Sequence, residues 1–208
     1  MNTRLQDLTS ERRDAILNAA LKEFSLKGFD DASTNKIAKA AGISKPLMFH
    51  YVSSKHELFL FVYDYFAELL NREYYQLINY DETDIFTRLR QSYALQIKLL
   101  KKYPWILDFS KLSSTTSSNE INNELTKRHS IQNTTCYPSI FDSISEARFR
   151  ANLDIEKCKQ IIYWSNVGFT NQILETIRNT EYSSINYIKT SKLLNEYIND
   201  LESIFYQN

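Results

Sequence analysis

A short stretch between residues 33 and 55 concentrates side chains that can bind nucleic acid. Ser44 and Lys45 open a run in which cationic groups and His50 alternate with large apolar side chains, and Lys55 follows it. Ammonium and hydroxyl groups bind phosphate oxygens, whereas polar and apolar groups on a helix can also reach base edges. The surrounding elements must present these side chains on one surface for the stretch to work.

The spacing of small and apolar residues over Ile37 to Tyr51 predicts a helix-turn-helix. A short helix is expected from Ser33 or Thr34 to Ala41, Gly42 permits a tight turn, and a second helix begins at Ser44. In a DNA-binding helix-turn-helix the second helix enters the major groove with its N-terminal side chains. This geometry leaves the following residues on or near the exposed side: Lys45, Pro46, Leu47, Phe49 and His50.

The stretch from Ala32 to Leu58, ASTNKIAKAAGISKPLMFHYVSSKHEL, resembles the DNA-binding segment of TetR/AcrR-type transcriptional regulators. The pieces that carry the resemblance are IAKAAGIS at 37–44, the aromatic cluster FHY at 49–51 and SSKHEL at 53–58. The resemblance implies an all-α chain in which an N-terminal three-helix head is joined by a long helix to a helical ligand-binding and dimerisation domain. We place these two domains at residues 1–54 and 55–208.

The resemblance also implies a function and a set of contacts. The chain would be a repressor that binds a palindromic operator in double-stranded DNA as a homodimer and is released by an apolar or aromatic small-molecule effector. Ser33 and Lys55 would contact phosphates, which helix N-termini and ammonium groups favour. The predicted DNA-binding residues are Ser33, Thr34, Ser44, Lys45, Pro46, Leu47, Phe49, His50, Tyr51 and Lys55.

Two residues depart from the pattern of the family. Pro46 stands where the family often has Gly, and a first helical turn accepts proline. Phe49 stands where the family often has Tyr, which removes a hydroxyl that could bind phosphate. These departures concern operator sequence and affinity rather than the DNA-binding role.

Other interpretations of the same residues compete with DNA binding. A helix-turn-helix can be a purely structural unit, and a helical protein-interaction adaptor that has lost DNA binding is the alternative function. Lys36 and Lys39 can simply solvate a helix face. His50 and His56 lack a clear third metal ligand, so we predict no metal site.

Composition and charge exclude several classes of protein. Residues 1–56 hold nine Lys and Arg against six Asp and Glu, so within a chain of zero net charge the positive surplus lies in the candidate DNA-binding region. The sequence has no Gly-rich phosphate loop or nucleophile motif, which argues against an enzyme, and we predict no cofactor. Cys136 and Cys158 lack CxxC spacing, and no apolar run approaches the roughly 20 residues of a membrane helix, so a cytoplasmic location is expected.

Apolar residues recur every three or four positions, and Gly and Pro are scarce at three each, which predicts helices throughout. Tyr103-Pro104 should form a corner and Pro138 should kink the helix that contains it. Asp154 and Ser184 should cap the last two helices. Beyond the helix-turn-helix, the expected helices span about 10–28, 55–79, 83–102, 105–112, 120–146, 154–177 and 184–205.

The last two helices are the candidates for dimerisation, because a two-fold operator requires two heads held at a fixed spacing. The family resemblance implies a four-helix bundle formed with the same helices of a second copy, with Gly168 allowing close approach. An intramolecular core is the alternative. The predicted interface residues are Trp164, Gly168, Phe169, Leu194, Tyr197 and Leu201.

Aromatic residues of the middle helices can line an apolar ligand pocket, although each can equally be ordinary core. The predicted lining residues are Tyr93, Trp105, Phe109, Tyr137 and Phe141. Asp108 and Asp142 lie in apolar stretches, and a carboxylate facing the pocket would favour a cationic or hydrogen-bonding ligand.

Overall fold

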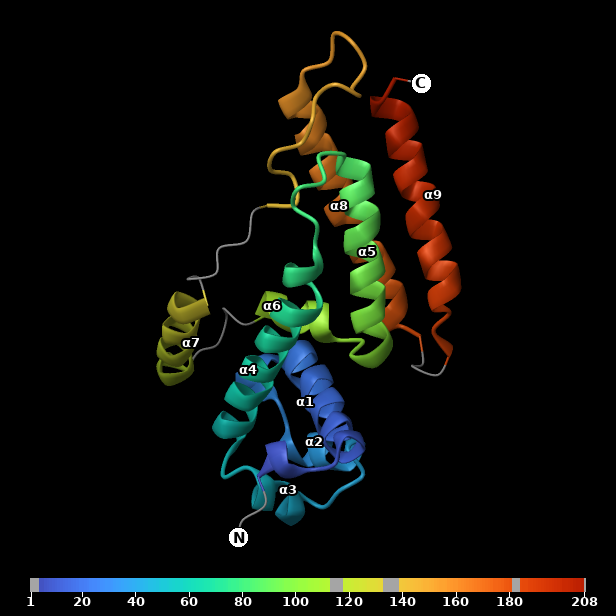
Figure 1. Ribbon diagram of the computed structural model, residues 1–208. Coiled ribbons are helices and arrows are strands. Elements are labelled where there is room, and N and C mark those ends of the chain that lie inside the picture. The colour runs from blue at the N-terminus through green and yellow to red at the C-terminus, as the bar shows by residue number, and fades with distance from the viewer. Residues whose placement is uncertain (1–3, 113–117, 133–138, 181–183, 208) are drawn as a thin grey trace. The chain divides into compact units, whose positions relative to one another are not determined.

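The chain is all-helical in a computed structural model that describes residues 4–112, 118–132, 139–180 and 184–207 (Figure 1). The predicted all-α fold is confirmed. In chain order the α-helices of the described part are α1 (Ser10–Asp31), α2 (Thr34–Ala40), α3 (Lys45–Tyr51), α4 (Lys55–Glu73), α5 (Ile85–Lys102), α6 (Ile106–Leu112), α7 (Asn119–Gln132), α8 (Ile155–Arg178) and α9 (Tyr187–Phe205), with short 3-10 turns at Leu5–Asp7 and Tyr75–Leu77.

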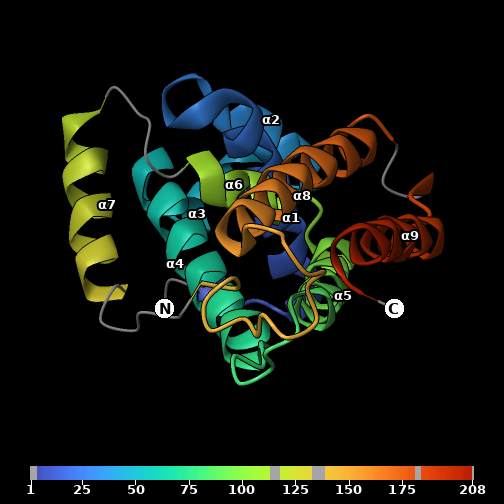
Figure 2. The same ribbon diagram turned by 90° about the horizontal axis from the view of Figure 1, so that it is seen from above.

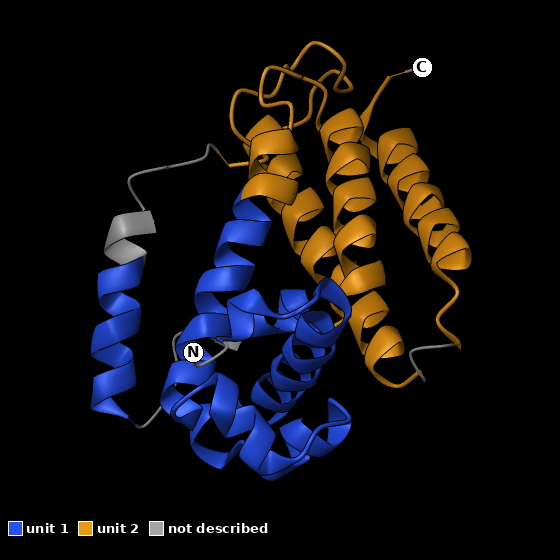
Figure 3. Cartoon of the chain, turned by 60° about the horizontal axis from the view of Figure 1, so that its bottom comes forward, with its two compact units in different colours: residues 1–71, 105–136 blue, residues 72–104, 137–208 orange. Residues whose placement is uncertain are grey.

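The chain divides into two compact units (Figure 3). Unit 1 comprises residues 1–71 and 105–136, and unit 2 comprises residues 72–104 and 137–208. Unit 1 takes in most of α4 together with α6, because α6 packs on α1. The proposed functional domains at 1–54 and 55–208 stay a prediction, since compactness alone assigns no function.

The core of unit 1 is formed by one apolar face from each of its main helices. Phe24 of α1 meets Phe59 of α4 edge to face, with ring centroids 5.0 Å apart, and Phe59 in turn contacts Phe109 of α6. Ile37 and Met48 are fully buried and bring α2 and α3 onto this core. The short helices therefore gain their stability from packing rather than from their length.

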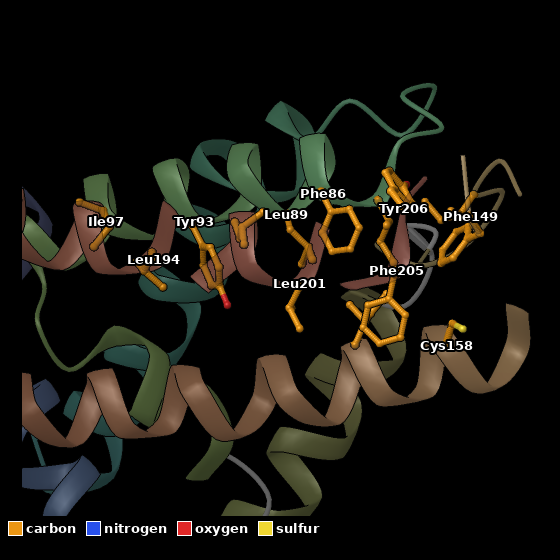
Figure 4. Packing of buried hydrophobic residues seen from close by; sticks show 14 residues of the cluster. Phe86, Leu89, Tyr93, Ile97, Phe149, Cys158, Leu194, Leu201, Phe205 and Tyr206 are labelled. Atoms are coloured by element: carbon orange, nitrogen blue, oxygen red, sulfur yellow. The ribbon is translucent and has the colours of Figure 1, made fainter. Parts of the chain in front are cut away.

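Unit 2 is built around α5, which lies beside α9 (Figure 2). A continuous apolar cluster includes Phe86, Leu89, Ile162 and Ile198 and fills the space among α5, α8 and α9 (Figure 4). Phe149 and Tyr206 form an antiparallel bridge that fastens the chain after α9 to the loop before α8.

Arg88 organises the loops of unit 2. Its side chain is fully buried, and its guanidinium donates to the carbonyls of Ile140 (3.0 Å), Asp142 (2.7 Å) and Tyr80 (2.9 Å), and also to that of Glu82. Burial lowers the pKa of Arg88, and the nearby ionisable groups of Glu82, Asp142 and Tyr80 oppose that effect. Two segments far apart in sequence are thus fixed by one side chain.

Several predicted helices have different bounds in the structure, and two of them differ by more than three residues. The helix predicted to reach about residue 79 ends at Glu73, because Gln91 of α5 binds the backbone beyond it, at Leu77 O and Asn79 N, both at 2.9 Å. The helix predicted over 120–146 ends at Gln132, and residues 139–146 form turns, with Ser143 at a φ of 56°. Pro138 lies outside the described residues.

Of the two caps predicted for the last two helices, one is confirmed and the other is wrong. Asp154 caps α8 as predicted, accepting from the N–H of Lys157 at 3.2 Å. The prediction that Ser184 caps the last helix is wrong, because Asn186 does so by accepting from the N–H of Lys189 at 2.9 Å. The described helices include none that is long and apolar enough to cross a bilayer.

Candidate nucleic-acid interface

The start of α2 is held by two hydrogen bonds. The Ser33 hydroxyl accepts from the N–H of Lys36 at 3.4 Å, as an N-cap does, and the Ser33 N–H donates to the Glu23 carboxylate of α1 at 3.0 Å. Thr34 begins the helix and is half-buried. The first turn of α2 is therefore fixed to α1 through a side chain that the sequence pattern did not indicate.

The turn between α2 and α3 is a Schellman motif around Gly42. The Gly42 N–H donates to Lys39 O at 3.1 Å, and the Ile43 N–H donates to Ala38 O at 3.0 Å. Gly42 has a φ of 69°, in the left-handed region that glycine adopts without strain. This turn sets the angle at which α3 leaves α2, as the predicted helix-turn-helix requires.

Helix α3 presents the predicted recognition residues at its N-terminal end. The Ser44 hydroxyl caps the helix by accepting from the N–H of Leu47 at 3.3 Å, with Pro46 in the first turn. Lys45, Pro46 and His50 are exposed, while Leu47 and Phe49 are half-buried. Side chains with these exposures can approach base edges and phosphates.

Two aromatic residues of α3 have different environments. Phe49 lies beside the Lys45 ammonium, with 5.9 Å between the nitrogen and the ring centroid. Tyr51 is buried in unit 1, and its ring meets that of His50 edge to face. Little of the Tyr51 surface is left to contact DNA, whereas the Lys45–Phe49 pair can present both charge and apolar area.

Lys55 opens α4, and its ammonium has partners within unit 1. The Nζ atom donates to Asp30 O at 2.9 Å and to Ala32 O at 3.3 Å, and lies 4.7 Å from the centroid of the Phe29 ring. The phosphate contact of Lys55 stays a prediction, and these internal contacts would compete with it.

The N-terminus of α4 carries a side-chain cap that the predicted site did not include. The Ser54 hydroxyl accepts from the Glu57 N–H at 3.0 Å, and Glu57 accepts from the Ser53 N–H at 2.6 Å and from the Ser53 hydroxyl. The hydroxyl and N–H of Ser53 hold the pKa of Glu57 below its usual value. The spacing Ser54-x-x-Glu57 could have revealed this cap from sequence.

The histidines of the region lie in different environments. His50 is exposed on α3, whereas His56 is half-buried, with Nδ1 3.4 Å from a carboxylate oxygen of Glu120 in α7. Among the described residues, no group of three or more His, Cys, Asp or Glu side chains is arranged to hold a metal ion.

The predicted dimer residues do not share one exposed face. Leu194 and Leu201 are only 5% and 7% exposed and belong to the core of unit 2, because they lie on the side of α9 that faces α5. Phe169 and Tyr197 stack on each other with centroids 4.1 Å apart. Trp164 is 63% exposed and Gly168 is also exposed. The predicted interface set did not include the other exposed apolar residues of α8, Ile161, Tyr163 and Val167.

The predicted pocket residues are divided between the two units. Phe109 is buried in unit 1, where the Lys22 ammonium lies over the ring of Trp105. Tyr93 is buried in unit 2 and its hydroxyl contacts Asn166 and Thr170, while Phe141 meets Tyr163 edge to face. Tyr137 lies outside the described residues. A common pocket for these residues therefore stays a prediction.

The carboxylates suggested for the pocket also differ. Asp108 of α6 is buried in unit 1. Asp142 is exposed, and its carboxylate accepts from the Ser139 N–H at 2.7 Å, so it closes a local turn. The role of the exposed Asp142 carboxylate is thus to close this local turn.

Short capped helices, a glycine turn and an exposed second helix define the helix-turn-helix class of DNA-binding domains. Residues 16–66 match the family described as bacterial regulatory proteins, tetR family. The sequence resemblance to TetR-type transcriptional regulators is thus confirmed for this N-terminal DNA-binding domain.

Known proteins resemble this chain to different extents. An uncharacterized HTH-type transcriptional regulator, YdgC of Bacillus subtilis (strain 168), is 43% identical over 49 residues, which are 24% of this chain and 25% of YdgC. The ketosteroid transcriptional regulator KstR2 of Mycobacterium tuberculosis has the same fold, with a TM-score of 0.62 and 16% identity over 97% of both chains. The structure of AibR in complex with isovaleryl coenzyme A and operator DNA gives a TM-score of 0.50 and 16% identity over 95% of this chain and 98% of AibR.

Proposed function

We propose that this chain binds a palindromic operator as a homodimer, represses transcription there, and is released by a small-molecule effector. The observation that carries the proposal is the exposed N-terminal end of α3, where Lys45, Pro46 and His50 stand on a helix fixed by the Ser44 cap and the Gly42 turn. A recognition helix held in this way can enter the major groove without having to order its own backbone.

The proposed contacts fall into two groups. Lys45, Leu47, Phe49 and His50 read base edges and the phosphates beside them, with the Lys45–Phe49 pair supplying a cation next to an apolar surface for a thymine methyl group. Ser33, Thr34 and Ser44 contribute hydroxyl and backbone groups to phosphates, Pro46 completes the surface, and the buried Tyr51 supports it from within unit 1.

A second copy of the chain is the proposed partner for the exposed apolar face of α8. Ile161, Trp164 and Val167 recur at a spacing of three residues, so they lie close together on one side of the helix. Covering such a face is favourable by roughly 25 cal/mol per Å² of apolar surface removed from water. Gly168 beside them allows another helix to approach closely.

The effector is proposed to be an apolar or aromatic molecule, recognised by buried aromatic residues of the kind seen in both units. AibR, which shares the fold, was crystallised with isovaleryl coenzyme A and operator DNA, and KstR2 is described as a ketosteroid regulator. These names support a small organic effector as the class of ligand for this chain.

The test is a fluorescence-anisotropy titration of DNA from upstream of the coding region, at two salt concentrations and with nonspecific competitor. We expect saturable binding that weakens steeply with salt, because each neutralised phosphate releases counterions. No preference over competitor would favour the alternative of a protein-interaction adaptor.

The Lys45→Ala variant tests the recognition helix directly. A lost base contact costs about 1–3 kcal/mol and changes the sequence preference. Lys192→Ala, which removes an exposed lysine of α9 that lies 3.7 Å from Glu196, is the matched control and should bind as the parent does. Equal loss on every operator variant would reassign Lys45 to a phosphate contact.

A further inference from the structure

We propose that α7 is a strap that holds the start of α4 in the position that operator binding requires, with Arg128 as the positioning residue that fastens it. The proposal rests on the proposed DNA-binding function and adds a means of regulating it. All of the residues that carry it belong to unit 1.

Two ion pairs join α7 to α4, and their spacing shows that the two helices run side by side in the same direction (Figure 1). His56 Nδ1 lies 3.4 Å from the Glu120 carboxylate, and Arg128 Nε donates to the Asp64 carboxylate at 2.8 Å. On each helix the two partners are eight residues apart, which is about 12 Å along a helix axis. The two pairs therefore bracket the first half of α4.

The pair made by Arg128 is the stronger of the two attachments. Its second nitrogen, Nη1, donates to Glu124, one turn earlier on α7, at 2.6 Å, so a carboxylate of the same helix orients the guanidinium. Arg128 is 25% exposed, whereas Glu120 at the other attachment is 76% exposed and faces an imidazole that is charged only when protonated. Solvent and salt therefore screen the Arg128 pair less.

Helix α7 depends on this docking for its own structure. It has 14 residues, Asn119–Gln132, and an isolated helix of about this length is only marginally stable in water. Among the α7 side chains that the structure describes, at residues 119–128, Ile121 and Leu125 are the buried ones. Because so little apolar surface is buried there, the ion pairs decide how firmly α7 is docked.

The start of α4 is directly connected to the recognition helix. Residues 52–54 separate α3 from α4, and the Val52 N–H donates to Met48 O of α3 at 3.1 Å. The Ser53 N–H donates to the carboxylate of Glu57 at 2.6 Å, in the same first turn of α4 as His56. Release of α7 would loosen this first turn and, through residues 52–54, the end of α3. An event that lifts α7 from α4 therefore weakens operator binding without touching the residues proposed to contact DNA.

The test reverses charges in the full chain. Arg128→Glu sets a like charge against Asp64, and Arg128→Glu combined with Asp64→Arg exchanges the two charges and restores their attraction. Lys127→Glu is the matched control, because it makes the same charge change on α7 and also loses a contact with Glu124, at 3.3 Å, but from a side chain that is 71% exposed. Asp64→Asn removes the same pair from the side of α4 and serves if Arg128→Glu fails to fold.

Operator affinity and hydrogen exchange are measured on each variant. For Arg128→Glu we expect about tenfold weaker operator binding, a slope of log K against log salt equal to that of the parent, and faster exchange in peptides covering residues 119–132 and 52–60. Asp64→Asn should weaken binding by about threefold. The charge exchange should restore both affinity and protection, and Lys127→Glu should leave both close to those of the parent.

Faster exchange in α7 with parent-like operator affinity would overturn the proposal, because α7 would then have a purely structural role. Unchanged exchange in Arg128→Glu would also overturn it, as would a shallower salt slope, which would place Arg128 on the DNA, or no recovery of affinity in the charge exchange. Failure of the DNA-binding function itself looks different, because the unsubstituted chain would then show no preference for the operator. The exchange measurements would still decide whether Arg128 fastens α7 to α4.

Discussion

The helix-turn-helix and the α8–α9 pair are held in place in different ways. In the former, caps at Ser33 and Ser44 and the turn at Gly42 lie within a few residues of the helices they fix. In the latter, tertiary contacts such as Tyr197 to Ser165 at 2.9 Å join residues far apart in sequence. Locally encoded geometry is visible in a single sequence, whereas geometry that depends on tertiary contacts is not.

The sharpest way to test this comparison is to contrast a buried and an exposed residue of the α8–α9 pair. Leu194→Ala should lower the free energy of unfolding by about 2–5 kcal/mol, because it leaves a cavity in the unit 2 core. Trp164→Ala should leave the fold intact and dissociate the proposed dimer. Urea denaturation and sedimentation velocity measure the two effects, and an intact Trp164→Ala dimer would place the interface elsewhere.

A smaller effect is expected from the glycines of the two regions. Gly42→Val should destabilise the head by about 1–3 kcal/mol, because a β-branched residue is strained at a φ of 69°. No atom lies within 4 Å of an added Cβ at either Gly42 or Gly168, so crowding within the chain plays no part. Gly168→Ala should stabilise α8 in the monomer by roughly 1 kcal/mol. Equal effects of the two substitutions in thermal denaturation would contradict this contrast.

Removing the cap of α3 tests the local encoding of the head. Ser44→Ala should cost about 1 kcal/mol of stability, because the Leu47 N–H loses its acceptor. Hydrogen exchange of peptides covering α3 is the measurement, and Ser44→Asp, which retains a capping oxygen, is the control. Unchanged exchange in Ser44→Ala would mean that packing of Met48 alone holds the helix.

The smallest expected effect is a pH dependence at the start of α8. The N–H of Lys157, followed by its ammonium, lowers the pKa of the Asp154 carboxyl. The stabilisation is therefore complete above the pKa of the unfolded chain and is lost as pH falls through the lower, folded value. Helix content followed through an acid titration should show this loss in the parent but not in Asp154→Asn, and identical curves would assign no role to the charge.

Most of the fold could be predicted from sequence, and the exceptions share a cause. The caps at Ser44 and Asp154 and the turn at Gly42 were readable because donor and acceptor lie three or four residues apart. The end of α4 was misplaced because Gln91, more than ten residues away, binds the backbone that follows the helix. Residues 139–146 were predicted as helix because local pattern does not reveal that Arg88 takes their carbonyls.

The same contrast between local signals and contacts distant in sequence applies to the candidate sites. Residues of the DNA-binding surface were found because their spacing defines the element that carries them, whereas the partners of Lys55 lie about 25 residues earlier in the chain. For the proposed dimer, apolar periodicity selected Leu194 and Leu201 along with Trp164, since both faces of an apolar helix satisfy the same pattern. Burial in the folded chain is what distinguishes the two faces.

Arg88 has a consequence for how this chain can change during evolution. Its acceptors at residues 80, 82, 140 and 142 are all backbone carbonyls, which every amino acid supplies. Substitutions in these two loops therefore leave the acceptors in place, while a substitution of Arg88 itself removes the donor for all four. As long as Arg88 is kept, the sequences of the two surrounding loops can therefore change without losing these four hydrogen bonds.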